Sequence, residues 1–187
     1  EANNMALVRR MMALLPAGEG IAAKSIDAAA DNPALQLKKQ DYDLERRAQR
    51  ELAMFTVYRL SRTDPDLATD YWRGMEKNLG EADRQYGWGQ IAFNAARKHH
   101  PQALNWYREA GNGKLDQEEL EWKVRAARRQ QDWATVQSTI DAMSSKGQND
   151  PAWRYWKGRA LKAQNRAGEA NALWAPLSRD HHYYGLL

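Results

Sequence analysis

Residues 122–130 read WKVRAARRQ and residues 156–164 read WKGRALKAQ, so Trp, Lys, Arg, Ala and Gln recur 34 positions apart. The same interval extends along the chain in three series of positions. The first series consists of large residues: Met54, Trp88, Trp122 and Trp156. The second series lies four positions later, at Tyr58, Ala92, Ala126 and Ala160. The third series lies 18 positions after the first, at Trp72, Trp106, Ile140 and Trp174. A period near 34 with this pattern of large and small residues is typical of stacked helical hairpins.

The spacing of four residues places each ring and the following alanine on one face of a helix. We therefore predict that Trp122 and Trp156 are largely buried against neighbouring hairpins, with Gly158 allowing a close approach between helices. Trp133 and Trp153 start their helices and lie outside the main series, so partial exposure is expected there. The alternative reading of these rings, a stacking platform for a ligand, is less typical of a stripe with helical spacing.

Segment boundaries also favour helices. Asp150-Pro151 and Asp64-Pro65 each supply an N-cap and a proline at the first helical position, whereas sustained period-two alternation is absent from the sequence. The predicted fold is all-α: a right-handed superhelical array of α-hairpins, tetratricopeptide-like (TPR-like), without a β-sheet. We divide the chain 1–187 into divergent N-terminal helices at 1–53, hairpin repeats at 54–179 and the start of a truncated helix at 180–187.

Composition limits the possible partners. The 187 residues carry a formal charge of +4, which favours encounters with anionic partners without naming one. Cysteine is absent, so a disulfide framework or a thiolate metal site is not available. The sequence contains no apolar run approaching the roughly 20 residues of a membrane-spanning helix, and we predict no transmembrane segment.

Sequence motifs for catalysis or cofactor binding find little support. Two glycine patterns that begin at Gly18 and Gly87 lack the preceding strand that a dinucleotide site needs. The adjacent histidines at 99–100 and 181–182 diverge on a helix, so solvated histidines at helix ends are expected instead of metal ligands. The cluster Glu118, Glu119 and Glu121 suits a helix start. We predict no catalytic residue, no metal and no cofactor.

Basic residues recur at equivalent positions of the two repeats quoted above. Lys123 and Arg125 correspond to Lys157 and Arg159. Such equivalents form a ladder along stacked hairpins, so these four residues are the candidate binding site for a glycan or another anionic polymer. A solvated helix face would have the same composition, and that alternative stays open.

Several longer stretches together resemble the helical region of periplasmic soluble lytic murein transglycosylases. They are YGWGQIAFNAARKHHPQALNWY (86–107), QDW (131–133), DPAWRYWKGRAL (150–161), NRAGEA (165–170) and YYGLL (183–187). The resemblance covers most of the chain and is strongest after Tyr86. It implies a periplasmic, U-shaped array of hairpins that closes into a ring with a linker domain and holds glycan strands for a separate lysozyme-like domain.

In that family the resemblance implies non-hydrolytic cleavage by a glutamic acid within a Glu-Ser motif, which leaves 1,6-anhydro ends. Neither that motif nor the accompanying Gly-Leu-Met-Gln segment is present here. We therefore expect a non-catalytic fragment, truncated at Leu187, that acts with the linker and catalytic domains of its parent chain. A freestanding adaptor for a peptide or protein is the first alternative. An RNA-binding repeat is the second, although nucleic acid is not among the predicted partners.

Overall fold

A computed structural model describes residues 5–12, 14, 20–111, 113–178 and 183–185. These residues form helices joined by short loops and contain no strand, which confirms the predicted all-α fold. The elements are α1 (Met5–Met12), α2 (Ala23–Asp31), α3 (Pro33–Lys39), α4 (Arg47–Ser61), α5 (Pro65–Met75), η1 (Glu76–Asn78), α6 (Glu81–Arg97), α7 (Ala103–Glu109), α8 (Gln117–Arg129), α9 (Trp133–Asp141), α10 (Ser145–Gln148), α11 (Pro151–Ala163), α12 (Ala167–Leu177) and η2 (Tyr183–Gly185).

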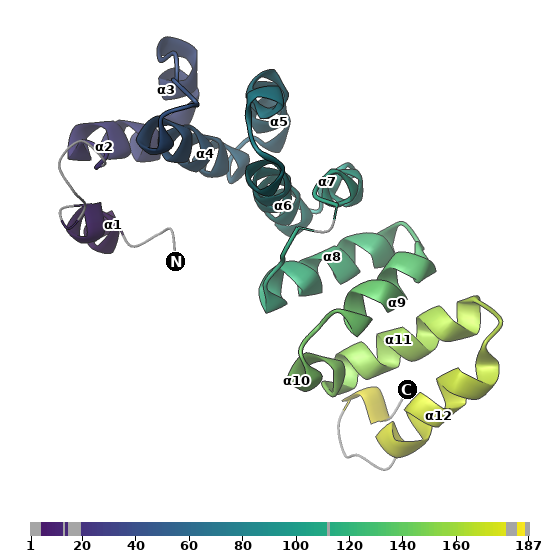
Figure 1. The fold of residues 1–187 in the computed structure, drawn as a ribbon. Coiled ribbons are helices and arrows are strands. Elements are labelled where there is room, and N and C mark those ends of the chain that lie inside the picture. Colours follow the sequence, from purple (N-terminus) through teal and green to yellow (C-terminus); the bar gives the residue numbers. More distant parts are fainter. Residues whose placement is uncertain (1–4, 13, 15–19, 112, 179–182, 186–187) are drawn as a thin grey trace.

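Four consecutive hairpins make up most of the structure. Helix α4 packs on α5, α6 on α7, α8 on α9, and α11 on α12. The hairpins are joined to one another through α4 with α6, α6 with α8, and α9 with α11. Figure 1 shows the resulting elongated, curved path from the N-terminal helices to α12. Within the described residues, no helix has the length and apolar character needed to cross a membrane.

The predicted helix starts are confirmed by side-chain caps. The carboxylate of Asp64 accepts a hydrogen bond from the backbone N–H of Leu67, and that of Asp150 accepts one from Ala152, each with proline at the first helical position. Asp116 forms a reciprocal capping box with Glu119 at the start of α8. These acceptors satisfy backbone donors that have no partner inside the helix. The aspartates thus fix where the hairpin helices begin.

A left-handed residue follows the first helix of three successive hairpins. His99, Gln131 and Asn165 have φ values of 60°, 56° and 62°. The next residue in each case donates its N–H back across the turn, from His100 to Ala95, from Asp132 to Ala127 and from Arg166 to Leu161, at 2.9–3.0 Å. This pattern is the Schellman helix ending. The turns between paired helices are therefore built alike although their sequences differ.

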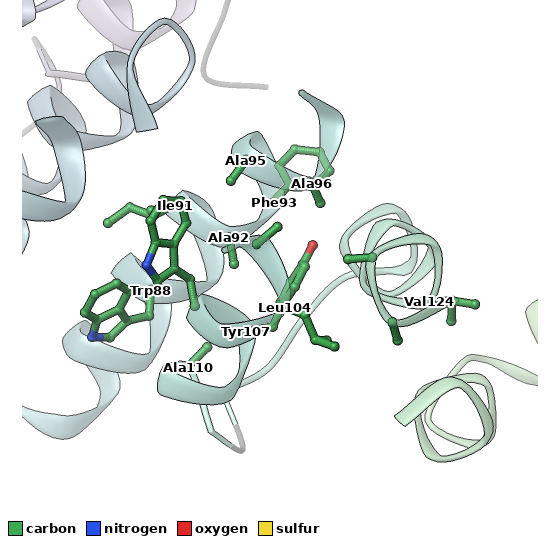
Figure 2. Close-up of a cluster of buried hydrophobic side chains, with 14 of the residues drawn as sticks. Trp88, Ile91, Ala92, Phe93, Ala95, Ala96, Leu104, Tyr107, Ala110 and Val124 are labelled. Carbon is green, nitrogen blue, oxygen red and sulfur yellow. The ribbon is translucent and has the colours of Figure 1, made fainter. Parts of the chain in front are cut away.

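The core follows the repeat where it crosses α6, α7 and α8. Trp88 and Ala92 are buried on α6, and Trp72, Trp106 and Ile140 are buried on the second helices of their hairpins. Figure 2 shows Leu104 and Tyr107 on the side toward the helix that carries Val124, with Trp88 and Ile91 farther from that helix. Packing of large residues against alanines thus joins neighbouring hairpins.

The predicted exposure of two tryptophans on α11 is reversed in the structure. Trp153 is only 7% exposed, whereas Trp156 is half-buried, as is Trp122 on α8. The segment 144–150 contains the short helix α10, and Trp153 lines a cavity together with Gly147 of that helix and Gln117 of α8. The guanidinium of Arg125 on α8 lies 5.0 Å from the ring centroid of Trp153, so Trp153 packs against the preceding hairpin and the periodicity alone assigned its exposure wrongly.

The predicted division of the chain stays a prediction. Its boundary at residue 54 falls within α4, which as a whole pairs with α5. The segment 180–187 lies largely outside the described residues, apart from the 3-10 turn at Tyr183–Gly185.

Candidate functional site

The predicted basic ladder lies across α8 and α11, where aromatic rings hold its members. The guanidinium of Arg125 lies 4.8 Å from the ring centroid of Trp122 on its own helix and 5.0 Å from that of Trp153 on α11. Arg128, which is not one of the four predicted ladder residues, lies 4.2 Å from the ring centroid of Trp156 on α11. A cation over an aromatic face is attracted by the ring quadrupole. Arg125 and Arg128 therefore connect two adjacent hairpins.

Two other members of the ladder are also engaged. The ammonium of Lys123 lies 5.8 Å from the ring centroid of Tyr107, and burial lowers the pKa of Lys123. Lys157 forms an ion pair with Asp141 at 2.5 Å. The structure thus places Lys123, Arg125 and Lys157 against partners on neighbouring helices. Arg159, the fourth predicted residue, is the one among them that lines a cavity of the described residues.

That cavity has a volume of about 500 Å³ and opens between α11, α12 and η2. Its walls combine four aromatic rings, two cations and small or aliphatic groups: Trp133, Tyr155, Trp174 and Tyr184; Arg159 and Lys162; Ala163, Leu177 and Ser178. We call it the aromatic cavity. Its size is within the range of small-molecule sites, roughly 300–1,000 Å³.

Helical spacing brings the two halves of the aromatic cavity together. Tyr155 and Arg159 are four residues apart on α11, and the guanidinium donates a hydrogen bond to the Tyr155 hydroxyl at 3.0 Å. On α12, the indole N–H of Trp174 donates to the backbone carbonyl of Tyr155 at 3.2 Å. The ring of Tyr184 lies 5.4 Å from that of Tyr155. These contacts fix the rings in place around the opening.

Sequence reasoning missed most of this cavity. The repeat includes Trp174 only as a member of its third series, and it gives no role to Tyr155. The available signal was the pair Tyr155 and Arg159 at the same interval as Trp156 and Ala160. Trp133 was expected to be partly exposed, and it is half-buried in the cavity wall, which confirms the prediction.

A second cavity, of about 750 Å³, lies between α4, α6 and the start of α8. We call it the acidic groove because Glu51, Asp116, Glu118 and Glu119 line it together with the basic residues Arg97 and Lys114. Its apolar walls include Phe55, Tyr58, Phe93 and Tyr86, the last of which is 55% exposed. The two cavities therefore differ in charge although both contain aromatic rings.

Glu119 is the buried carboxyl of the groove. It is 7% exposed, and burial raises its pKa. Both carboxylate oxygens have donors, since Oε2 accepts from the backbone N–H of Asp116 at 2.7 Å and Oε1 accepts from the side chain of Gln90. The backbone carbonyl of Glu119 accepts from the hydroxyl of Tyr107 at 3.0 Å. Glu119 thus completes the capping box and anchors α8 on the preceding hairpin.

Metal ligands are not clustered in the part of the chain that the structure describes, where no three His, Asp or Glu side chains surround a common point. His99 ends α6 as predicted and is exposed. His100 instead stacks on Trp106 at 4.8 Å and pairs with Asp66 at 3.1 Å, so its ring is more covered than a solvated histidine. His181 and His182 lie outside the described residues.

Comparison with solved structures finds a long helical match. The chain superimposes on the crystal structure of an inactive mutant of the lytic transglycosylase Slt from Pseudomonas aeruginosa with a TM-score of 0.72 and 22% sequence identity. The match covers 98% of this chain and 30% of that enzyme. Family models give no match, and a search of curated proteins finds no relative. The likeness establishes a shared all-α fold over nearly the whole chain.

Proposed function

We propose that the chain is a non-catalytic helical scaffold of a peptidoglycan lytic transglycosylase. The supporting observation is the structural match to Slt, which extends over 98% of this chain but only 30% of that enzyme. The parent protein would act in the periplasm and cleave the bond between N-acetylmuramic acid and N-acetylglucosamine, leaving 1,6-anhydro ends. The scaffold would hold glycan strands and would work with linker and catalytic domains.

The local chemistry supports a role in holding rather than cutting. A general acid for glycosidic cleavage must present a carboxyl group to the substrate oxygen. Glu119 has a raised pKa, yet its two oxygens already accept hydrogen bonds that fix the start of α8. The half-buried rings of the aromatic cavity and the exposed cations Arg159 and Lys162, in contrast, are suited to contact a sugar polymer along the surface.

Incubation of the purified chain with murein sacculi tests both parts of the proposal. Co-sedimentation with the sacculi is expected, and mass spectrometry is expected to detect no 1,6-anhydromuropeptides above background. An active lytic transglycosylase serves as the positive control for cleavage. Products that disappear when a glutamate of this chain is replaced by glutamine would refute the non-catalytic role. A chain that stays in the supernatant would argue against glycan binding.

The acidic groove favours a second candidate, a peptide-binding adaptor. It is about 750 Å³ in volume, and its exposed Tyr86 lies among four carboxylates on successive hairpins. Helical repeats commonly bind extended segments in such grooves. Capture of a basic peptide by the chain, lost in a Tyr86→Ala variant, together with no retention on sacculi, would support the adaptor over the scaffold.

A further inference from the structure

The charge pattern of the aromatic cavity differs from that of the acidic groove. Arg159 and Lys162 are exposed at its edge, and none of the described residues that line it is acidic. The acidic groove, by comparison, contains four carboxylates and two cations. An anionic ligand is therefore attracted to the aromatic cavity and repelled from most of the acidic groove.

The cations of the aromatic cavity also differ from others on the same hairpins. Lys157 is paired with Asp141, and Arg166 is paired with Glu169 at 2.7 Å. Among the described residues, Arg159 and Lys162 have no carboxylate partner. Arg159 is oriented by the Tyr155 hydroxyl, and Lys162 lies 5.8 Å from the ring centroid of Trp174. Their charges are thus positioned beside rings and available to a ligand.

The rings supply the other half of the recognition surface. Tyr155, Trp174 and Tyr184 are each half-buried, so part of each side chain is open to solvent while hydrogen bonds and ring contacts hold it. A pyranose ring presents a face of C–H groups that packs on an aromatic face, and its hydroxyls stay solvated. A pyranose with an attached carboxylate would contact the aromatic rings through its C–H face and the cations through its charge.

We propose that the aromatic cavity binds a pyranose ring that carries a carboxylate, with the ring on Tyr155, Trp174 and Tyr184 and the carboxylate at Arg159 and Lys162. This inference rests on the proposed function for the identity of the polymer, in which N-acetylmuramic acid has a free carboxylate wherever its stem peptide has been removed. The cavity would then recognise a muramyl unit without a stem peptide and fix the register in which the scaffold holds that strand.

Nuclear magnetic resonance of the chain, titrated with N-acetylmuramic acid, tests this site. The indole N–H signals of Trp133 and Trp174, assigned with Trp→Phe variants, are expected to shift in a saturable way while the indole of the fully buried Trp72 does not. N-acetylglucosamine, which lacks the carboxylate, is expected to bind at least about tenfold more weakly, because charge-assisted hydrogen bonds are lost. Added salt should weaken the first titration.

Two double variants that each remove two positive charges, one pair at the cavity and one pair outside it, test the role of the cations. Arg159→Gln with Lys162→Gln is expected to weaken N-acetylmuramic acid binding about tenfold or more. Lys77→Gln with Arg84→Gln removes the same charge from exposed positions outside the cavities described above and should leave binding unchanged. No shift at Trp133 and Trp174, equal affinity for both sugars, or unchanged binding in the first double variant would overturn the proposal.

Co-sedimentation with sacculi in parallel separates this site from the proposed function. Retention on sacculi without an N-acetylmuramic acid response would refute the aromatic cavity as the sugar site and leave the scaffold function standing. A specific N-acetylmuramic acid response without retention would support the cavity and refute the scaffold function.

Discussion

The indole of Trp174 packs directly on Gly158: a Cβ atom at position 158 would lie 2.2 Å from the indole nitrogen. The same nitrogen donates to the backbone carbonyl of Tyr155 at 3.2 Å, so Trp174 cannot withdraw without losing that bond. Gly158 therefore permits the close approach of α11 and α12 that the sequence predicted.

Gly158→Ala is expected to lower the free energy of unfolding by about 1–3 kcal/mol, because the methyl group would overlap the indole. Gly74→Ala is the matched control, since a Cβ there meets nothing within 4 Å. That change should be neutral or stabilising by up to about 1 kcal/mol, as expected for alanine in a helix. Urea unfolding measures both, and a Gly158→Ala variant as stable as the wild type would contradict the packing.

Trp153→Ala should destabilise the chain more than Trp156→Ala. Trp153 is 7% exposed, so its removal is expected to cost roughly 3–5 kcal/mol, whereas half-buried Trp156 should cost about 2 kcal/mol. This ordering replaces the expectation from the repeat, which predicted burial of Trp156 and partial exposure of Trp153. Thermal or urea unfolding of the two variants decides the order, and equal losses would contradict the greater burial of Trp153.

Gln131→Gly should stabilise the turn between α8 and α9. Gln131 has φ 56°, a conformation that costs a residue with a Cβ about 1–2 kcal/mol and costs glycine little. We expect a gain of about 0.5–1 kcal/mol in the free energy of unfolding. The neighbouring Gln130, at φ −89°, is the control, and Gln130→Gly should be destabilising. The reverse order of the two variants would argue against the left-handed turn.

Glu119 should make stability depend on pH. Burial raises the pKa of Glu119 in the folded state above its ordinary value of 4.5, so the folded chain holds this proton more tightly than the unfolded chain does. Its contribution to stability is therefore fully present below that value and is lost as the pH rises through the raised pKa. Unfolding of the wild type and Glu119→Gln is compared between about pH 4 and pH 8. The wild type should lose stability relative to the variant as pH rises, and a constant or opposite difference would refute the assignment.

The sequence predicted the parts of the fold that depend on neighbouring residues. Aspartate caps act within the first helical turn, and the spacing of four between a large residue and the following alanine spans about one turn. Repetition of these local signals every 34 residues defines the hairpins. The burial of Trp153 involves contact with the preceding hairpin, where Arg125 lies 5.0 Å from its ring centroid, and the periodicity of its own helix does not reveal that contact. The sequence also does not show which basic side chains form ion pairs. Lys157 and Arg159 are two residues apart, yet only the first reaches a carboxylate, because its partner Asp141 comes from another hairpin.

Each hairpin packs on its sequence neighbours, so the array can bend through small rotations between successive hairpins. Helices that touch are close in the chain, from α2 on α4 to α9 on α11 (Figure 1). A small rotation at every interface adds up along such a stack, so its curvature can change while each local contact keeps its partners. The distance between α4 and α12 can then vary. A polymer bound at several points along the array would fix that distance and would be strained when it changes.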